Sequence, residues 1–294
     1  MFKAKIRILF LISGLLIFTL PFIGGDCDSE NNPPAPVTGI AEPLNVSVVV
    51  TSDSTGAESY AVIQWDASPD ENMENFYGYR IITYKLDSDN NYLSVFENES
   101  IPKDSHSFTV GPIGTGVKFR SFVLSRLNDG SESDSVATIN YAGVLYRTDG
   151  TIDEYQPADT SVIKSGYGWN FQTGEGFNLF CNSDNTGLID MNLRGGVNDS
   201  LTLYSPDLFP PGTKSTRFIY IGRGQDAFDQ SVLPEPADDS VRVDSDDVFL
   251  LKTQEGYYAK IWIKSIRFVA GSIPPFYNIL FDYKIQPIKG FRVL

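Results

Sequence analysis

An acidic segment near the end of the chain holds the residue types that could bind a cation. Five carboxylates stand within ten residues from Asp238, and Asp244 and Asp246 alternate along the chain. Calcium is bound by roughly six to eight oxygen ligands, mostly from carboxylates. The sequence therefore makes Asp244, Asp246 and Asp247 candidate calcium ligands. The alternative interpretation is a solvated acidic turn between two strands.

The spacing in this segment excludes one familiar calcium loop. Counting from Asp244, Glu255 falls at the twelfth position, where an EF-hand has its bidentate glutamate. Val248 and Phe249 occupy the fifth and sixth positions, which require an oxygen ligand and a glycine. Calcium is thus the one cofactor that we consider, and no EF-hand is expected.

Aromatic residues in the second half of the chain could form a binding face. Trp169, Tyr257 and Trp262 are candidates for a platform on which a sugar or a peptide would stack. If they form such a platform, these rings should be exposed and coplanar. The alternative is that they fill the core of a β-sheet protein and bind nothing.

Catalytic motifs are scarce in this sequence. The only histidine, His106, stands in the polar stretch Lys103–Ser107, and we expect it to be an exposed turn residue rather than part of a Ser-His-Asp triad. The sequence contains no HExxH, CxxC or phosphate-binding GxxxxGK[ST] motif. A pair of carboxylates could serve a glycosidase, but Asp190 and Asp282 could equally face solvent. We therefore expect a protein that is not an enzyme.

The first 26 residues have the pattern of an export signal. Lys3, Lys5 and Arg7 precede the apolar run Ile8–Ile23, and small residues follow it. The run is short for a membrane span, which needs about 20 apolar residues, and Gly14 and Pro21 interrupt it. We predict a signal peptide over residues 1–26, which places the protein in the cell envelope or outside the cell.

Cys27 follows this signal and resembles the lipid-attachment cysteine of bacterial lipoproteins. That pattern implies a lipid on Cys27, at the outer membrane or the cell surface, although Asp26 replaces the usual small residue. Cleavage near Gly25 into a secreted protein is the alternative. Residues 27–35 read as a proline-rich linker. Cys181 lies in an apolar stretch, where we expect a buried thiol, although a bridge to Cys27 stays open.

Composition limits the classes of partner. The formal net charge of −14 argues against nucleic acids and anionic membrane surfaces, both of which need basic footprints. Aromatic residues make up 13% of the chain, with 25 Gly and 17 Pro, and no long stretch has helical periodicity. These features predict an all-β protein, and the length of the chain predicts two domains.

Residues 36–141 contain seven short strand patterns separated by turn signals. They include Val46–Val50, Ala61–Asp66, Phe76–Tyr84 and a long alternating stretch from Val117 to Leu127, which the tight turn Asn128–Gly130 follows. Seven such strands over about a hundred residues predict a β-sandwich.

This region resembles a fibronectin type III domain. The shared features are the opening prolines, Trp65 in the second strand and the Tyr77–Tyr79 strand, and they continue through Ile113–Phe119. The resemblance implies that Trp65 packs between the two sheets. It also implies that Phe119, where the family usually has a tyrosine, keeps the ring packing but loses a hydrogen bond to the backbone.

Residues 142–294 are predicted to form a second β-rich domain. In the strand Tyr257–Ile266, Lys260 and Lys264 alternate with Ile261 and Ile263, which predicts a sheet with one face in water. This half distantly resembles the β-domain of HmuY-like lipoproteins, through residues 171–174, the Asp190 strand and residues 251–261. Haem-carrying members typically use paired histidines, and this half has none, so we expect no haem.

Together these observations predict an exported, lipid-anchored, non-catalytic binding or adhesion protein of the bacterial cell envelope. Its partner would be an extracellular or envelope ligand, either protein or polysaccharide, and it would reach the membrane through the lipid alone. The alternatives are a purely structural envelope component and a polysaccharide-binding accessory of a secreted hydrolase.

Overall fold

The computed structural model describes residues 39–53, 58–157, 162–195, 200–209, 212–272 and 274–294. The predicted signal peptide, Cys27 and the linker lie outside these residues. All of the described residues belong to one compact unit of the chain. Within them, no helix combines the length and the apolar character that crossing a membrane requires.

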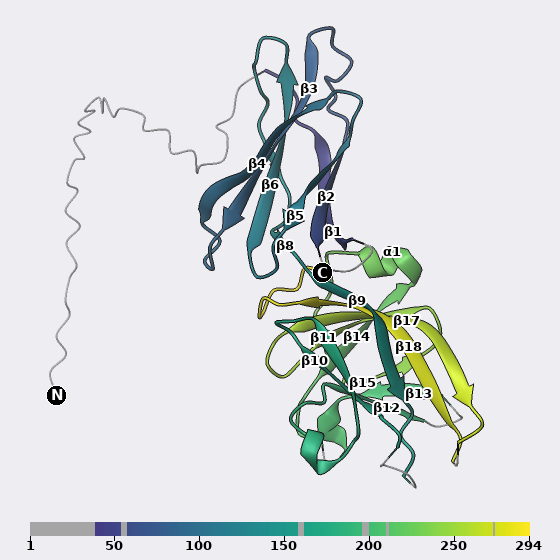
Figure 1. Ribbon diagram of the computed structural model, residues 1–294. Coiled ribbons are helices and arrows are strands. Elements are labelled where there is room, and N and C mark those ends of the chain that lie inside the picture. The colour runs from purple at the N-terminus through teal and green to yellow at the C-terminus, as the bar shows by residue number, and fades with distance from the viewer. Residues whose placement is uncertain (1–38, 54–57, 158–161, 196–199, 210–211, 273) are drawn as a thin grey trace, which may run out of the picture. The chain divides into compact units, whose positions relative to one another are not determined.

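Two antiparallel sheets built from residues 44–142 face each other (Figure 1), and we call them the N-terminal sandwich. One sheet has the order β1-β2-β5, formed by β1 (Leu44–Ser52), β2 (Ser59–Asp66) and β5 (Ser107–Ile113). The other has the order β4-β3-β6-β7, formed by β4 (Tyr92–Pro102), β3 (Phe76–Leu86), β6 (Lys118–Leu127) and β7 (Val136–Ala137), and β8 (Tyr141–Ala142) also pairs with β6. The predicted sandwich is confirmed.

Buried and more exposed residues alternate strictly along β2, so one face of this strand points into the core. Ala61, Ile63 and Trp65 are buried, while the residues between them are not. The Trp65 ring contacts the Tyr79 ring edge-on, with centroids 5.4 Å apart. Phe119 is buried and stacks on Tyr141 at 6.0 Å. The inward tryptophan and the ring packing at Phe119 are therefore as the sequence predicted.

Two five-stranded antiparallel sheets form the rest of the described chain, and we call them the C-terminal sandwich (Figure 1). The first has the order β11-β10-β12-β13-β15: β11 (Glu175–Leu179), β10 (Gly166–Asn170), β12 (Met191–Gly195), β13 (Leu201–Tyr204) and β15 (Ser240–Val243). The second has the order β14-β16-β17-β18-β9: β14 (Arg217–Arg223), β16 (Asp247–Lys252), β17 (Tyr258–Val269), β18 (Phe276–Gln286) and β9 (Leu145–Asp153).

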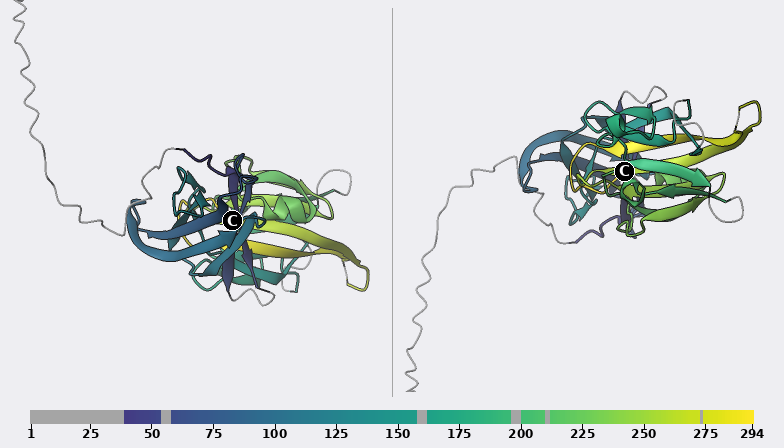
Figure 2. Two further views of the ribbon diagram at one scale, coloured as in Figure 1. Left: turned by 90° about the horizontal axis from the view of Figure 1, so that it is seen from above. Right: turned by 90° about the horizontal axis from the view of Figure 1, so that it is seen from below.

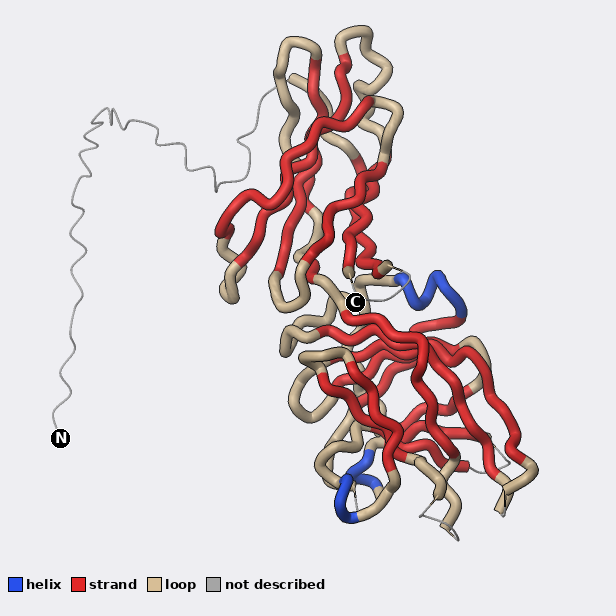
Figure 3. Tube along the Cα trace, viewed as in Figure 1, coloured by secondary structure: helices blue, strands red, loops and turns tan. Residues whose placement is uncertain are grey.

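Figure 3 shows how little of the described chain is helical. Its helical segments include α1 (Gly224–Asp229) and the 3-10 turns η1 (Ser183–Asn185) and η3 (Pro206–Leu208). The all-β fold class is confirmed. In both views of Figure 2 the β17–β18 hairpin, drawn in yellow, extends past the neighbouring strands.

The core of the C-terminal sandwich is apolar and draws on both of its sheets. Met191 and Leu193 from one sheet and Phe249, Ile261 and Phe281 from the other are buried in a single cluster. Burying a side chain of this kind contributes about 2 kcal/mol. Met191 is thus a core residue, as expected of a methionine in an alternating strand.

The prediction of a wet face on β17 is wrong at Lys260. Lys264 is exposed, but Lys260 has no exposed surface. Its Nζ donates hydrogen bonds to the carbonyl oxygens of Phe228 at 2.9 Å and Gln230 at 2.6 Å. Helix α1 and the segment after it cover this part of the sheet, and period-two alternation carries no information about such a cover.

No sheet of the described residues combines strands from the two sandwiches, but one apolar cluster contains side chains from both. Val50 and Val144 pack in the same buried cluster as Leu250, Tyr258 and Leu294. The strands change sheet between β8 and β9, and the domain boundary that we predict between residues 141 and 142 stays a prediction. Whether each sandwich folds as an independent domain stays a prediction.

Candidate ligand-binding site

An open pocket of about 370 Å³ lies at one end of the C-terminal sandwich. Its walls combine aromatic, aliphatic, amide and charged side chains, a mixture typical of small-ligand sites. We call it the aromatic pocket, and it is lined by Trp169, Asn170, Phe171, Gln172, Phe177, Leu188, Lys214, Glu255 and Tyr257.

The hairpin of β10 and β11, with the turn between them, supplies most of the pocket wall. Asn170 shapes this turn, because its Oδ1 accepts hydrogen bonds from the backbone nitrogens of Gln172 at 3.0 Å and Thr173 at 3.3 Å. Phe171 then stacks on Tyr257, with ring centroids 4.7 Å apart and planes 12° apart. A turn of one sheet and the residue preceding β17 of the other are thus held together by an aromatic pair.

Two apolar side chains of this pocket are open to solvent. Phe177 is 43% exposed and Leu188 is 57% exposed. Exposed side chains of this size that share a pocket rim with polar groups are typical of a contact surface rather than of a core.

A chain of ionic contacts runs through the polar side of the pocket. The ammonium of Lys214 lies 3.0 Å from Asp190 Oδ1 and 3.0 Å from Glu255 Oε1. Asp190 has no exposed surface, and its Oδ2 accepts a hydrogen bond from the backbone nitrogen of Trp169 at 3.0 Å. Asp190 therefore anchors both the strand of Trp169 and the lysine that faces the pocket.

Burial and ion pairing act in opposite directions on these groups. Burial raises the pKa of Asp190 above its ordinary value, although Lys214 opposes this shift. Burial is the largest influence on Glu255 and would raise its pKa, but the hydrogen bonds and the charge of Lys214 together lower it. Burial is also the largest influence on Lys214 and would lower its pKa, but the charges and hydrogen bonds of Asp190 and Glu255 together raise it. Lys214 is therefore positively charged at neutral pH.

Two polar atoms at the pocket are buried without a protein partner among the described residues. They are Nε1 of Trp169 and Oε2 of Glu255. An unsatisfied buried polar atom costs about 1–3 kcal/mol. Because neither atom is accessible in this structure, a ligand with a hydroxyl or an amide group would pair with them only after the neighbouring side chains move.

The three predicted platform residues do not form one face. Trp169 is buried, with its ring against Tyr167 at 5.2 Å, so only part of it reaches the pocket beside Tyr257. Trp262 lies elsewhere, where its Nε1 donates to Asp246 Oδ1 at 2.9 Å. Five residues of extended chain separate positions 257 and 262, which corresponds to roughly 16 Å. The structure brings Trp169 and Tyr257 together and leaves Trp262 out.

The predicted calcium ligands are engaged by protein donors. Asp247 Oδ1 lies 2.9 Å from Arg223 Nε, and its Oδ2 accepts from the backbone nitrogen of Asp244 at 2.8 Å. Asp246 accepts from Trp262, as described above. In the described parts of the chain, no three His, Cys, Asp or Glu side chains lie close enough together to hold a metal ion. These carboxylates organise the turn between β15 and β16, and their geometry lends calcium no support.

His106 is more constrained than the sequence suggested. Its Nε2 lies 2.7 Å from Glu71 Oε2, and its ring contacts Tyr79 edge-on at 5.8 Å. The side chain is therefore half-buried in a network that holds a turn of the N-terminal sandwich. Asp282, for which solvent exposure was an alternative, is buried beside Tyr146 at 3.3 Å.

Cys181 is a free, buried cysteine, in agreement with its apolar surroundings in the sequence. Its thiol donates to Asn192 Oδ1 at 3.2 Å, and burial raises its pKa, which disfavours the reactive thiolate. It is a structural residue.

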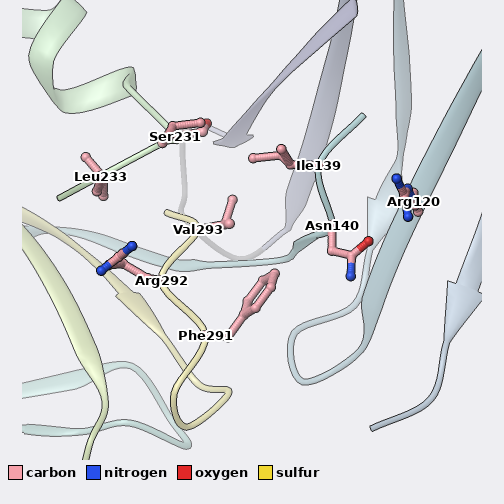
Figure 4. A pocket seen from close by; sticks show the side chains of 9 residues that line it. Arg120, Ile139, Asn140, Ser231, Leu233, Phe291, Arg292 and Val293 are labelled. Carbon is pink, nitrogen blue, oxygen red and sulfur yellow. The ribbon is translucent and has the colours of Figure 1, made fainter. Parts of the chain in front are cut away.

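A second hollow, of about 420 Å³, has Arg120 and Arg292 on opposite sides with Phe291 and Val293 between them (Figure 4). Arg120 Nε donates to the Thr138 carbonyl oxygen at 3.2 Å. Arg292 is bound to Glu235. Both cations have protein partners, so this hollow offers a ligand less than the aromatic pocket does.

The sequence analysis missed Lys214 as a site residue and considered Glu255 only as a calcium ligand. Lys214 lies in the loop before β14 and belongs to no periodic pattern. Its two partners are 24 and 41 positions away in the sequence. No local signal connects these three residues, so only the fold reveals them.

Comparison with solved structures gives fibronectin type III domains. An Fn3-like protein from Clostridium thermocellum is 23% identical, with a TM-score of 0.24, over 34% of this chain and 88% of that one. A segment of two such domains from chicken tenascin is 14% identical, with a TM-score of 0.27, over 76% of this chain and 92% of that one. The third fibronectin III domain of a human protein is 16% identical, with a TM-score of 0.25, over 36% of this chain and 88% of that one.

Scores this low carry no argument about function. The fibronectin type III-like fold of residues 44–142 rests on its own two-sheet strand order and inward tryptophan. No protein-family model matches this sequence, and no curated protein matches it.

Proposed function

We propose that this chain is a non-catalytic binding protein of the bacterial cell envelope and that the aromatic pocket holds its ligand. The export pattern of residues 1–26 and the cysteine at position 27 support an exported, lipid-anchored protein. The absence of catalytic motifs from the sequence supports a binding role. Along the chain, the N-terminal sandwich lies between the proposed anchor and the residues of the pocket.

The chemistry of the pocket favours a neutral sugar as the ligand. A sugar ring presents C–H groups that pack on an aromatic face and hydroxyl groups that donate and accept hydrogen bonds. Phe177 and Tyr257 offer the aromatic surface, and Glu255 and Lys214 offer an acceptor and a donor. A purely apolar ligand would leave Oε2 of Glu255 without a partner, which is costly.

A single observation carries this proposal. Exposed aromatic surface at Phe177 and two buried, unpaired polar atoms, on Trp169 and Glu255, meet in one pocket. Either feature alone is common in folded proteins. Their combination supports a site that a polar and apolar ligand would complete.

Calorimetric titration of the purified chain with a panel of neutral oligosaccharides tests the proposal. We expect at least one to bind, and Phe177→Ala to weaken it by about tenfold, the loss of one aromatic contact. The matched control is Phe268→Ala, which removes another exposed phenylalanine, from the β17–β18 hairpin. Failure of the whole panel, or equal weakening by both substitutions, would refute a sugar site in this pocket.

The anchor is tested separately by the intact mass of the protein taken from the membrane fraction of its host. A chain that begins at Cys27 and carries a diacyl or triacyl increment is the expected result. An unmodified chain beginning near Gly25 in the medium would remove the anchor and leave a secreted binding protein.

A purely structural envelope component is the second candidate, and the burial of Tyr167 and Trp169 favours it. Tryptophan quenching by iodide distinguishes the two, because a ligand that covers the pocket should reduce quenching only in a binding protein. The distant resemblance of residues 142–294 to HmuY-like lipoproteins fits an exported binding protein and stays a prediction. The second half contains no histidine, so our proposal includes no haem.

A further inference from the structure

Arg194, on β12, is held between two aromatic rings. Its guanidinium carbon lies 4.0 Å from the centroid of the Tyr155 ring and 3.8 Å from that of Phe209. Cation–π contacts of this kind use the faces of the guanidinium group. Its edge, which carries the N–H donors, is what remains for hydrogen bonding.

The clamp around Arg194 is fixed by other contacts. The backbone nitrogen of Tyr155 donates to the Leu193 carbonyl oxygen at 2.9 Å, which ties Tyr155 to β12. Phe209 follows η3, and its ring meets Tyr204 edge-on at 5.0 Å. Because both rings are anchored, the orientation of the guanidinium plane is set before any ligand arrives, and such preorganisation favours binding.

Among the described residues, Arg194 has no carboxylate partner, unlike most of the other arginines. Six other described arginines lie within 4.0 Å of a carboxylate oxygen. No described carboxylate lies that close to Arg194, and its Nε is buried without an acceptor. Burial also lowers the pKa of Arg194, a penalty that an anion beside it would relieve.

A pocket of about 330 Å³ adjoins this arginine, with Gln156, Gly195 and Tyr204 among its lining residues. It shares no lining residue with the aromatic pocket. Glu154 also lines it, and one carboxylate oxygen of Glu154 accepts from the backbone nitrogen of Tyr277 at 3.0 Å. This negative charge disfavours a doubly charged anion more than a singly charged one.

We propose that the Tyr155–Arg194–Phe209 clamp is a second binding site, which takes the carboxylate of a small ligand. A planar carboxylate matches the edge of a guanidinium group and forms two parallel hydrogen bonds with it. Glu154 makes a monoanion preferable to phosphate. Two sources present such a group, an acidic sugar and the end of a peptide chain.

Nuclear magnetic resonance of the full chain tests this site through the Nε–H signal of Arg194. The probes are glucuronate and N-acetylalanine, their neutral counterparts glucose and N-acetylalanine methylamide, and inorganic phosphate. We expect a saturable shift with a carboxylate and none with the neutral compounds. Tighter binding of glucuronate indicates an acidic sugar, whereas tighter binding of N-acetylalanine indicates a peptide end.

Arg194→Lys keeps the charge but loses the planar fork. We expect it to weaken carboxylate binding by about tenfold or more, the loss of one charge-assisted hydrogen bond, as followed at the Gly195 amide. Arg267→Lys changes an exposed arginine of β17 in the same way and should leave binding unchanged. The proposal fails if no carboxylate binds at about 10 mM, if Arg194→Lys binds as tightly as the natural protein, or if phosphate binds more tightly than both carboxylates.

Discussion

The ammonium of Lys214 lies 3.0 Å from Oδ1 of Asp190, a carboxylate with no exposed surface. Asp190 also accepts the backbone N–H of Trp169. One buried carboxylate thus joins the loop before β14 to the strand that forms the pocket wall. The pocket depends on this pair for its shape as well as for its charge.

Lys214→Met should destabilise the protein by about 3 kcal/mol, because it leaves a buried carboxylate without its counter-charge. Urea denaturation measures the change. Lys252→Met is the matched control, since it breaks an exposed pair with Glu235 and should cost less than about 1 kcal/mol. Equal losses in the two variants would contradict the importance of Asp190.

The loss in Lys214→Met should also depend on pH. Burial raises the pKa of Asp190 above its unfolded value, so the folded state holds this proton more tightly. The stability that this provides is present below the unfolded pKa, near about pH 4, and is lost as pH rises through the folded pKa. In the natural protein, the attraction between Lys214 and the ionised Asp190 offsets part of that loss. Lys214→Met removes this attraction. The deficit relative to the natural protein should therefore be small near about pH 4 and larger at neutral pH, and a deficit independent of pH would contradict this account.

Gly168→Ala should disrupt the pocket wall. A Cβ at position 168 would lie 1.8 Å from the backbone oxygen of Leu188, a contact that can be relieved only by moving β10. We expect a loss of about 3 kcal/mol or more in urea denaturation, as for an overpacked core. Gly187→Ala is the control, because a Cβ there meets nothing within 4 Å and should cost little. A mild effect at position 168 would show that β10 can shift away from Leu188.

The alternation of apolar and polar residues predicted burial correctly in strands that have one face in the core and the other in solvent. Ala61, Ile63 and Trp65 point inward because each second residue of β2 faces the opposite sheet. Lys260 obeys the same alternation, but α1, some thirty residues away, covers its face. Burial by a segment distant in the sequence depends on the tertiary structure and does not change the alternating pattern of the strand itself.

The candidate site was only half predictable for a related reason. Trp169 and Tyr257 attract notice by their residue type, and both line the pocket. Lys214 and Asp190 acquire their roles only when a loop and a strand 24 positions apart meet. The acidic residues 244–247 are a different case, because proximity in the sequence suggested a shared cation, whereas Asp246 and Asp247 accept hydrogen bonds from protein donors. Calcium at these residues stays a prediction.

The buried Lys260 should make stability rise with pH in mildly alkaline solution. Burial and the nearby Lys284 hold the pKa of Lys260 well below its ordinary value, and Asp229 only partly opposes this. Between the lowered pKa of folded Lys260 and its unfolded pKa of about 10.4, the unfolded chain therefore binds a proton that the folded protein does not. The free energy of unfolding should rise by up to about 1.4 kcal/mol per pH unit from this residue.

Lys260→Met removes this contribution. Over that pH range, the free energy of unfolding should therefore rise more with pH in the natural protein than in the variant. Lys264→Met, on the same strand but exposed, should show no such trend. Measurements should stay below about pH 10. Burial raises the pKa of Tyr141 and Tyr146 to about 12, so above about pH 10 these tyrosines make stability fall as pH rises. An identical pH slope in the natural protein and Lys260→Met would show that Lys260 is charged in the folded state.

Tyr79→Phe should destabilise the N-terminal sandwich without enlarging any cavity. The Tyr79 hydroxyl accepts the backbone N–H of Ser68 at 2.9 Å and donates to Glu71, which also holds His106. Removing the hydroxyl leaves the Ser68 N–H buried without an acceptor, at a cost of about 1–2 kcal/mol in urea denaturation. Tyr77→Phe removes the hydroxyl of a neighbouring tyrosine that is 54% exposed, and should be nearly neutral. If Tyr79→Phe is equally neutral, water takes the place of the hydroxyl and the Glu71 network does not hold the turn.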